Sequence, residues 1–357
     1  MSKKALIAMS GGVDSSVAAL IMKNNQYECI GATMILADEK IVNSDAACCN
    51  EENIADAKKV CERLSMEHFV YDFSSDFQTE VIDRFVCAYK CGETPNPCVD
   101  CNRYIKWGLL FEKCEELGCE KIVTGHYAQV VYDEDSRKWL LKKGLDHSKD
   151  QSYVLYSLTQ KQLEKISLPL GGMSKDKVRN IAEESGFVNS HKKDSQDICF
   201  VPDGDYAKFI EDYTNETFPQ GDYVDKSGNT LGKHQGIIRY TRGQRKGLGI
   251  ALGKRTFVLD VNVAENKVVL GENEDLFSRE LIAENINLIS IDKITDGMKV
   301  KAKIRYNHTE ADASVYYIDD NSFKVIFDEP QRAITKGQAV VLYDGDTVIG
   351  GGKIVNY

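Results

Sequence analysis

The segment Ser10–Ser16 has the residue types that bind a phosphate group. It reads Ser-Gly-Gly-Val-Asp-Ser-Ser and lies between the apolar run Lys4–Met9 and a helix predicted over Ser15–Lys23. Its two glycines allow a tight turn in which backbone N–H groups converge on one anion, and the helix adds its positive N-terminal end. The segment lacks the Gly-Lys-Ser/Thr ending of a Walker A loop, so transfer of a γ-phosphate is not its natural chemistry. The alternative is an ordinary glycine turn that caps a helix, which the strand–loop–helix context disfavours.

A second segment, Thr94–Asn102, holds two prolines and the cysteines Cys98 and Cys101. Proline fixes its own φ angle, so thiols in this segment would be held in place. A helix predicted to begin near Arg103 would lower the pKa of the Cys101 thiol and favour the nucleophilic thiolate. The Cys-x-x-Cys spacing alone leaves a redox pair, a metal site and coincidence open.

The other cysteines are distributed unevenly. Of the 11 cysteines, only Cys199 lies beyond the first third of the chain, within the polar stretch Asp194–Phe200. An odd count in a chain without a recognisable signal peptide argues against a set of disulfides. Cys91 is left unassigned, and an incidental or structural role is expected for the adjacent Cys48 and Cys49. Five cysteines fall in predicted strands or helices and are expected to pack in the core: Cys29, Cys61, Cys87, Cys114 and Cys119.

Strand-like and helix-like runs alternate over the first half of the chain, which predicts a parallel sheet covered by helices on both faces. Ligands of such sheets bind beyond the carboxyl ends of the strands. The loop after Met9, the strand end at Met34 and the segment Thr124–His126 all lie at such ends. Met34 is therefore a candidate for an adenine pocket, although a methionine at one position is as often a core residue.

The chain becomes mainly β after about Pro202. Short strands separated by glycine turns are predicted there, among them Gln235–Tyr240, and from about Leu281 the strands succeed one another as in a small barrel or sandwich. Before this point, a helix is predicted over Ser152–Leu158. We expect three domains: an α/β domain (residues 1–202), a small mainly β central domain (203–278) and a C-terminal β-barrel (279–357).

The composition predicts a cytoplasmic globular protein. Hydrophobic residues make up 42% of the 357 residues, and no apolar run reaches the length of a membrane span. The net charge of −10 argues against a general nucleic-acid coat. Within this acidic chain, Lys226–Val258 has no Asp or Glu, which favours an RNA-binding surface over a solvated basic face. Its eight basic residues are Lys226, Lys233, Arg239, Arg242, Arg245, Lys246, Lys254 and Arg255.

Taken together and in this order, these segments resemble bacterial tRNA-specific 2-thiouridylases of the MnmA type. The resemblance spans essentially the whole chain and is carried by the PP-loop Ser10–Ser16 and by Thr94–Asn102, Thr124–Ala128, Lys149–Tyr153, Asp194–Phe200 and Tyr240–Gly249. It implies a sheet like that of the adenine nucleotide α-hydrolases, and a reaction in which ATP adenylates the C2 oxygen of the wobble uridine before sulfur carried by the enzyme displaces AMP. It further implies Mg²⁺ with the ATP, tRNAs for lysine, glutamate and glutamine as substrates, and a sulfur donor such as a cysteine desulfurase or a relay protein.

The resemblance also implies roles for individual residues. Cys199 would receive sulfur as a persulfide, and Cys101 would resolve that persulfide or release sulfide. The target base would meet Asn96, Pro97 and Cys98. The nucleotide would meet Ala8, Met9, Ser10, Gly11, Gly12, Val13, Asp14, Ser15, Ser16, Met34 and Gly125. The tRNA would meet His126, Lys149, Asp150, Gln151, Arg305, Tyr306 and Gln338.

One departure from the family pattern leaves the mechanism open. The familiar form of the second segment carries Asp where this chain has Cys98. Cys98, Cys101 and Cys199 could therefore hold a [4Fe–4S] cluster with one open iron, in place of a persulfide relay. Two other functions stay as alternatives. A PP-loop amide-forming synthetase for a small molecule gives no use to the distant thiols, and a non-catalytic RNA-binding protein leaves the phosphate loop idle.

Overall fold

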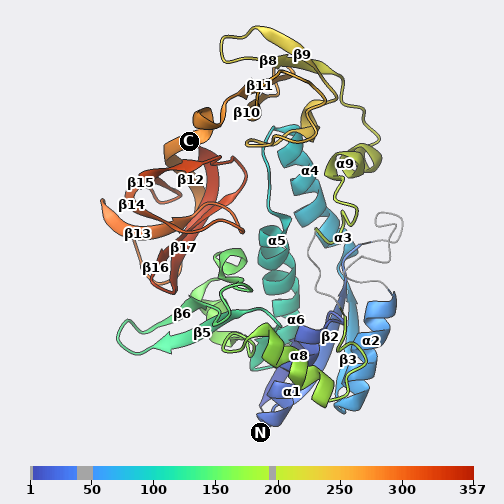
Figure 1. Cartoon of the computed structure of the whole chain (residues 1–357). Helices are drawn as coiled ribbons and strands as arrows, with labels where there is room; N and C mark the ends of the chain where they lie inside the picture. Colours follow the sequence, from blue (N-terminus) through green and yellow to red (C-terminus); the bar gives the residue numbers. More distant parts are fainter. Residues whose placement is uncertain (1–2, 38–50, 193–197) are drawn as a thin grey trace.

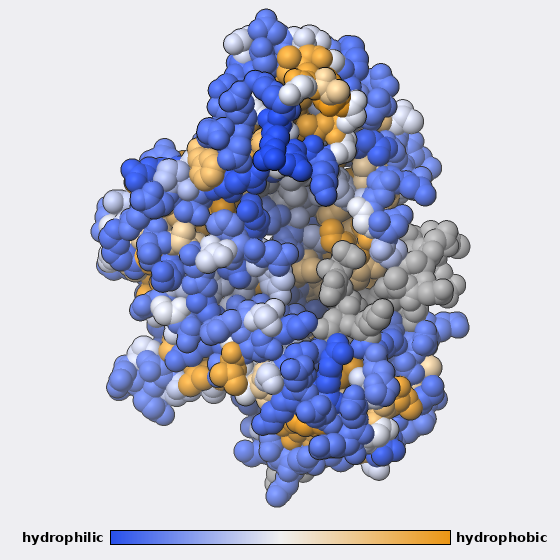
Figure 2. Space-filling view, viewed as in Figure 1, coloured by the Kyte–Doolittle hydropathy of each residue, from blue (hydrophilic) through white to orange (hydrophobic). Residues whose placement is uncertain are grey.

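The computed structural model describes residues 3–37, 51–192 and 198–357, so Cys48 and Cys49 lie outside the described residues. Three parts surround a central column of helices: an α/β part that carries the N-terminus, a small β part, and a barrel that carries the C-terminus (Figure 1). Figure 2 shows that this face is hollowed in the middle, between the small β part and the α/β part, and that hydrophilic residues dominate around the hollow. No helix within the described ranges is long and apolar enough to cross a membrane.

The α/β part is built on a five-stranded parallel sheet. In spatial order its strands are β3 (Glu67–Asp72), β2 (Glu28–Ile35), β1 (Lys4–Ala8), β4 (Lys121–Val123) and β7 (Ile166–Ser167). Alternate residues of β1 enter two different clusters: Ala5 and Ile7 pack with α1 (Val13–Asn24), α2 (Glu51–Arg63) and α8 (Lys175–Glu184). Leu6 packs with the helices between residues 74 and 116. The sheet is covered on both faces, as the alternating pattern predicts.

Two helical runs cover the second face and form the central column (Figure 1). The first consists of α3 (Ser74–Phe77), the π-helical η1 (Gln78–Ile82) and α4 (Asp83–Lys90). The second consists of α5 (Pro97–Asp100), the π-helical η2 (Cys101–Leu109) and α6 (Leu110–Glu116). Helix α4 buries Phe85, Val86 and Tyr89, and Cys87 lies on the opposite side and is exposed. The prediction that Cys87 packs in the core is therefore wrong, whereas the other four cysteines assigned to the core are buried.

The small β part is a four-stranded sheet. Its strands lie in the order β10 (Phe257–Asn262), β11 (Lys267–Gly271), β8 (Gly221–Val224) and β9 (Thr230–His234), and the helix α9 (Tyr206–Thr214) precedes them. The predicted strand Gln235–Tyr240 is wrong. Gly236 has a φ of +110°, and the chain turns there into the 3₁₀ helix η4 (Ile237–Arg239), so the strand ends at His234.

The last part is a closed six-stranded barrel. Its strands are β12 (Phe277–Leu288), β13 (Met298–Lys303), β14 (Ala311–Asp319), β15 (Ser322–Arg332), β16 (Ala339–Asp344) and β17 (Thr347–Asn356), and the 3₁₀ helix η5 (Asn273–Leu276) leads into them. Closure follows because β12 pairs with both β15 and β17. The structure confirms the predicted fold class: a PP-loop α/β domain, a small mainly β part and a C-terminal barrel.

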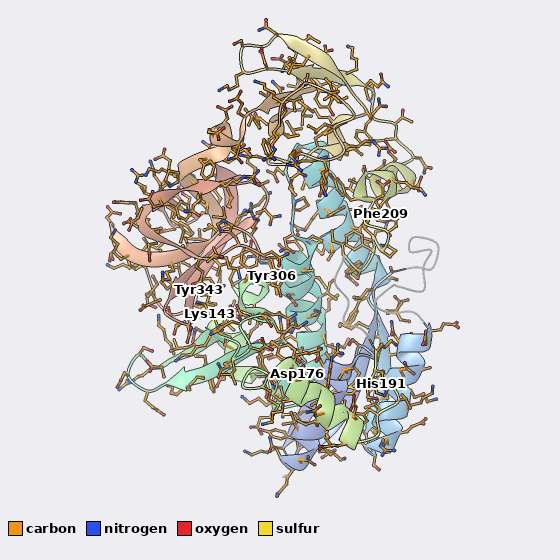
Figure 3. The ribbon with its side chains drawn as sticks, in the orientation of Figure 1. Lys143, Asp176, His191, Phe209, Tyr306 and Tyr343 are labelled. Atoms are coloured by element: carbon orange, nitrogen blue, oxygen red, sulfur yellow. The ribbon has the colours of Figure 1, made fainter. Side chains whose placement is uncertain are left out.

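A hairpin from the α/β part extends the barrel sheet. It consists of β5 (Ala128–Asp133) and β6 (Lys138–Lys143), and β6 pairs with β17 at Lys142 and Thr347. Lys143 lies beneath the barrel in Figure 3, where its ammonium group is 2.7 Å from the Glu310 carboxylate and 4.7 Å from the Tyr343 ring centroid. Both charged side chains are largely buried, so this ion pair fixes how the two parts are docked.

Two shorter elements complete the α/β part. The helix predicted over Ser152–Leu158 is only the 3₁₀ turn η3 (Ser152–Leu155), and α7 (Gln160–Lys165) follows it. Thr159 and Gln162 form a capping box that starts α7 anew, which explains why one longer helix does not form. Helix α8 begins after its predicted N-cap, Ser174, whose hydroxyl accepts a hydrogen bond from the Lys177 N–H.

Candidate active site

The PP-loop is a turn that only glycine can make at its first bend. Gly11 has a φ of +72°, and a Cβ atom there would lie 2.3 Å from the Asn53 carbonyl oxygen, at the start of α2. The hydroxyls of Ser15 and Ser16 both donate to the Gly12 carbonyl at 3.0 Å. Hydrogen bonds within the loop therefore fix its shape, and the start of α1 sets the direction of its N–H groups.

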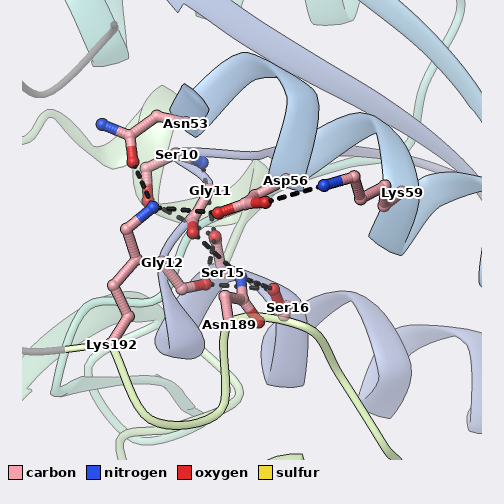
Figure 4. A network of polar contacts seen from close by, with 10 residues as sticks. All are labelled: Ser10, Gly11, Gly12, Ser15, Ser16, Asn53, Asp56, Lys59, Asn189 and Lys192. Atoms are coloured by element: carbon pink, nitrogen blue, oxygen red, sulfur yellow. Dashed lines mark hydrogen bonds and ion pairs between the residues drawn. The ribbon is translucent and has the colours of Figure 1, made fainter. Parts of the chain in front are cut away.

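Asn189 and Lys192, which precede Cys199 in the chain, make polar contacts with the PP-loop and with the start of α2 (Figure 4). The Asn189 side-chain amide donates to the Gly11 carbonyl at 2.9 Å and to the Ser16 hydroxyl at 3.0 Å. The Lys192 ammonium group donates to the Asn53 side chain at 2.7 Å and lies 3.0 Å from the Asp56 carboxylate. Asn189 and Lys192 were not predicted from the sequence, because nothing in the spacing indicates that residues near 190 return to a loop near 11.

Asp14 is fixed by two partners that the sequence also did not reveal. The Tyr127 hydroxyl donates to its carboxylate at 2.8 Å, and the buried Lys175 ammonium group lies 2.8 Å away. The signal for Lys175 was present but weak: a lysine in the first turn of a predicted helix whose N-terminus faces the sheet's ligand edge. Burial of a lysine requires a charged partner, and Asp14 supplies it.

These elements enclose a cavity of about 580 Å³, within the range of about 300–1,000 Å³ that is usual for small-molecule sites. Of the predicted nucleotide-binding residues, those in its wall are Ala8, Met9, Ser10, Gly12, Val13, Asp14, Ser15, Met34 and Gly125. Gly11 and Ser16 lie behind the wall and shape the loop. Four lysines also line the cavity: Lys106, Lys149, Lys175 and Lys192. Such a wall suits an anionic nucleotide with its phosphates at the glycine turn.

Four of the residues expected to touch tRNA lie in the same wall: His126, Lys149, Gln151 and Tyr306. His126 is buried, and its ring nitrogen Nδ1 lies 2.7 Å from the Thr124 hydroxyl. Burial, helped by the charge of Lys106, holds the pKa of His126 well below its usual value. The ring is therefore neutral at physiological pH and can serve as a hydrogen-bonding group but not as a cation.

The other three residues expected to touch tRNA have structural contacts. Asp150 accepts hydrogen bonds from the Gly144 N–H at 3.0 Å and the Ser152 hydroxyl at 2.8 Å. The Arg305 guanidinium points to backbone carbonyls of the barrel at 3.4 and 3.5 Å. The Gln338 amide donates to the Thr94 carbonyl at 2.7 Å, so this barrel residue holds the segment that carries Cys98 and Cys101.

The cysteine-bearing segment enters a helix earlier than predicted. The helical run begins at Pro97, with Asn96 as the N-cap whose side-chain oxygen accepts from the Cys98 N–H at 3.2 Å. Cys98 is exposed, and Cys101 is half-buried at the start of η2. Burial raises the pKa of Tyr306, and the neighbouring Asp150 and Cys98 add to this rise. Tyr306 thus lies in the cavity wall and within electrostatic range of Cys98; Figure 3 places it between the barrel and the central helices.

Cys199 lies against the same core as Cys101. The adjacent Phe200 ring packs edge-on against Phe77 and Phe85, at centroid distances of 5.8 and 5.2 Å. Cys101 and Cys199 are both half-buried at the edge of the hydrophobic cluster that contains these rings. As the described residues define it, the wall of the large cavity contains none of Cys98, Cys101 and Cys199.

A [4Fe–4S] cluster does not fit the arrangement of these thiols. Within the described part of the chain, no three side chains of His, Cys, Asp or Glu are grouped as metal ligands would be. Three thiolates must converge on one cube of iron and sulfur to hold such a cluster. We therefore derive no step through a cluster.

Fewer side chains of the basic segment Lys226–Val258 are available to bind RNA than its composition suggests. Four of its eight cations are paired with acidic residues from outside the segment: Lys226 with Asp275, Lys233 with Asp222, Arg239 with Glu211 and Lys254 with Glu272. Arg242 lies over the Tyr357 ring at 4.2 Å from its centroid. Arg245, Lys246 and Arg255 are exposed and have no ion pair with any described residue, so these three are the remaining candidates for phosphate contacts.

The fold and the cavity define a PP-loop nucleotide-binding protein that is joined to two β domains. Family models agree with each part: one described as tRNA methyl transferase HUP domain matches residues 3–203, one described as tRNA methyl transferase PRC-barrel domain matches 207–272, and one described as Aminomethyltransferase beta-barrel domain matches 278–354. The chain is 48% identical over 355 residues to tRNA-specific 2-thiouridylase MnmA of Clostridioides difficile (strain 630), covering 99% of this chain and 98% of that protein. It is also 48% identical over 356 residues to the enzyme of the same name from Clostridium acetobutylicum, covering 99% and 100%. The chain belongs to the MnmA family of tRNA-specific 2-thiouridylases.

Proposed function

We propose that the chain uses ATP to replace the C2 oxygen of the wobble uridine of tRNA with sulfur. The observation that carries the proposal is a nucleotide-sized cavity at the PP-loop whose wall includes Tyr306, a residue within electrostatic range of Cys98. Membership of the family supports the same activity. The tRNAs for lysine, glutamate and glutamine are the expected substrates, and a cysteine desulfurase or a relay protein is the expected sulfur donor.

The residues of the cavity have distinct tasks in the first step. The glycine turn and the four lysines hold the triphosphate, and Met34 and Leu36 line the cavity beside them. The uridine C2 oxygen attacks the α-phosphorus, pyrophosphate leaves, and the base carries AMP on its oxygen. Mg²⁺ bound to the ATP would share the charge of the phosphates with the lysines. Lys175, held by Asp14, is placed to stabilise the departing pyrophosphate.

The thiols act in the second step. A persulfide on Cys199 attacks C2 with its terminal sulfur, and AMP leaves with the former C2 oxygen. The Cys101 thiolate then attacks the inner sulfur, which forms a Cys101–Cys199 disulfide and leaves the second sulfur on the base. Both thiols contact one large hydrophobic cluster, and the reaction requires them to meet during turnover. A dithiol reductant restores the enzyme.

The test is mass spectrometry of unthiolated tRNA after incubation with the full chain, ATP and a sulfur source, with AMP measured in parallel. We expect one sulfur on the base and AMP release that depends on tRNA. Cys199→Ser should abolish thiolation and leave tRNA affinity unchanged. If thiolation survives Cys199→Ser, the proposed sulfur route is wrong. If a small metabolite instead of tRNA stimulates AMP release, the chain is an amide-forming synthetase.

A further inference from the structure

A pair of exposed cysteines lies outside the site described above. Cys87 and Cys91 are separated by one turn at the end of α4, where the Cys91 N–H donates to the Cys87 carbonyl at 3.0 Å. Their side chains therefore share one face of the helix. Free cysteines are among the most buried residues in proteins. Two exposed thiols on one helix face are thus a feature that core packing does not explain.

Both thiols line a second cavity of about 420 Å³. It is also lined by Asn96, Asp100 and Arg103, which belong to or adjoin the segment that carries Cys98 and Cys101, and by Lys353 of the barrel. Asp100 is the chain neighbour of Cys101. Hydrosulfide released here would attack the Cys101–Cys199 disulfide that a turnover leaves, which restores the Cys199 persulfide and the Cys101 thiol.

The two thiols are not equivalent. Burial raises the pKa of the Cys91 thiol, and the adjacent Cys87 and Glu93 add to this rise. The raised pKa makes Cys91 a poor nucleophile at neutral pH, so the first attack is assigned to Cys87. Arg84 and Arg103 also line the cavity and favour an anionic sulfur donor, although Arg84 is shared with Glu80 at 2.8 Å.

We propose that Cys87 and Cys91 form a dithiol site that takes sulfane sulfur from a persulfide and releases it as hydrosulfide beside the segment of Cys98 and Cys101. The proposal rests on the proposed function, because tRNA thiolation is the reaction that consumes the sulfur. The Cys87 thiolate attacks the terminal sulfur of the donor R–S–SH, so R–S⁻ leaves and Cys87 carries a persulfide. Cys91 then attacks the inner sulfur of that persulfide, which forms a Cys87–Cys91 disulfide and releases hydrosulfide.

The step balances without a further oxidant, because two thiols are oxidised while the sulfane sulfur is reduced. Residues one helical turn apart have Cα atoms roughly 6 Å from each other, within the range of about 4.4–6.8 Å that a disulfide spans. Their Cβ atoms lie about 5–6 Å apart, beyond the range of about 3.5–4.5 Å that a disulfide allows, so the bond requires the helix end to move. Cys91 is the C-cap of α4 and is followed by Gly92, so the helix end can adjust. A dithiol reductant returns the site to its starting state.

The direct test uses the full chain carrying Cys98→Ser, Cys101→Ser and Cys199→Ser, reduced and kept without oxygen, with glutathione persulfide as the donor. We expect a burst of hydrosulfide and a Cys87–Cys91 disulfide on the isolated peptide, formed at least about tenfold faster than free cysteine reacts. With Cys91→Ser added, the sulfur should stay on Cys87 as a persulfide. The buried pair Cys114 and Cys119 in the same chain is the matched control and should acquire no sulfur. If Cys87 gains sulfur no faster than free cysteine, the proposal is overturned.

A second measurement separates this proposal from the proposed function. In the otherwise unaltered chain, Cys87→Ser with Cys91→Ser should lower tRNA thiolation about tenfold when the persulfide is the sulfur source. It should leave thiolation unchanged when sodium sulfide is supplied. Equal thiolation of both chains with the persulfide would overturn the dithiol site. Failure of the unaltered chain with both sulfur sources would overturn the proposed function, whatever the peptide measurement gives.

Discussion

Asp100 is a carboxyl group whose environment opposes its charge. It precedes Cys101 in the chain and lines the second cavity, and burial raises its pKa to about 6, even though Arg84 and Arg103 act in the opposite direction. The folded chain therefore binds this proton more tightly than the unfolded chain does. Its contribution to stability is complete below the unfolded pKa, near 4, and is lost as the pH rises through about 6.

Asp100→Asn, which keeps the shape of the protonated carboxyl, should therefore raise the free energy of unfolding only at the higher pH. We expect no difference from the unaltered chain near pH 4, and a gain on the order of 1–3 kcal/mol above pH 6.5. Urea denaturation at several pH values measures it. Asp212→Asn changes an exposed aspartate and is the control. A gain that is the same at every pH would show that charge burial is not its cause.

At the same scale, the sequence predicted the residues that belong to a local motif and missed those that reach it from afar. Ser10, Gly12 and Gly125 could be placed in the cavity because strand ends meet at one edge of a parallel sheet. Lys175 and Asn189 could not, because no local pattern states which distant side chain returns to a loop. Cys87 was misjudged because helical spacing identifies an apolar face but not the side chain that faces a cavity between domains.

At the scale of elements, the turn after β4 and the PP-loop are packed against each other without space for a side chain. A Cβ atom on Gly125 would lie 2.8 Å from the Asp14 Cβ and 3.0 Å from the Ser15 N–H nitrogen. Both of these atoms belong to the start of α1, whose position sets the aim of the loop's N–H groups. The glycine is thus required by the approach of two elements and not by its own φ angle.

Gly125→Ala should push the turn and the PP-loop apart. Overpacking of this kind costs about 1–3 kcal/mol, so we expect the KM for ATP to rise about tenfold or more while the chain still folds. Steady-state AMP release measures the KM, and thermal unfolding checks the fold. Gly172→Ala is the matched control, because nothing lies within 4 Å of its added Cβ atom. An unchanged KM for Gly125→Ala would mean that the two elements separate without disturbing the loop.

Element types were predicted well where one pattern repeats and poorly where the chain turns on specific contacts. The strands of the parallel sheet and of the barrel follow from short apolar runs bounded by turn residues. The 3₁₀ turns η3 and η4 do not, because Thr159–Gln162 capping and the bend at Gly236 decide them. The start of the Cys98 helix was also placed too late, since Pro97 at the first helical position signals an earlier start.

At the scale of the whole molecule, three side chains of the basic segment remain as candidates for contacts with RNA phosphates. Arg245, Lys246 and Arg255 are exposed, whereas Lys226, Lys233 and Lys254 each have a carboxylate within 2.7 Å. Replacing the first three with Ala should weaken tRNA binding and lower the salt dependence of log K by about 0.7 for each phosphate that the protein no longer neutralises. Replacing the paired three removes the same charge and is the control. Equal weakening of binding in both triple variants would mean that net charge alone attracts the RNA.

Gln338 lies where the barrel packs on the α/β part, so it has two possible roles: to bind tRNA or to position the segment of Cys98 and Cys101. If Gln338 touches tRNA, its replacement would lower RNA affinity. As the donor to the Thr94 carbonyl, supported by the Thr94 N–H that donates to the Lys336 carbonyl at 2.9 Å, it positions the segment of Cys98 and Cys101. The second role predicts that the barrel positions the segment of Cys98 and Cys101 before any tRNA binds.

Gln338→Leu should therefore lower the rate of thiolation about tenfold to a hundredfold, because small displacements of reacting groups have large effects on rate, while tRNA affinity stays the same. Single-turnover thiolation at saturating tRNA gives the rate, and filter binding gives the affinity. Gln331→Leu makes the same change at another barrel glutamine, whose amide donates to the Glu329 carbonyl within its own strand, and should affect neither quantity. A lower affinity with an unchanged saturated rate would assign Gln338 to the RNA surface and leave the positioning of the cysteine segment to the backbone hydrogen bond at Lys336 alone.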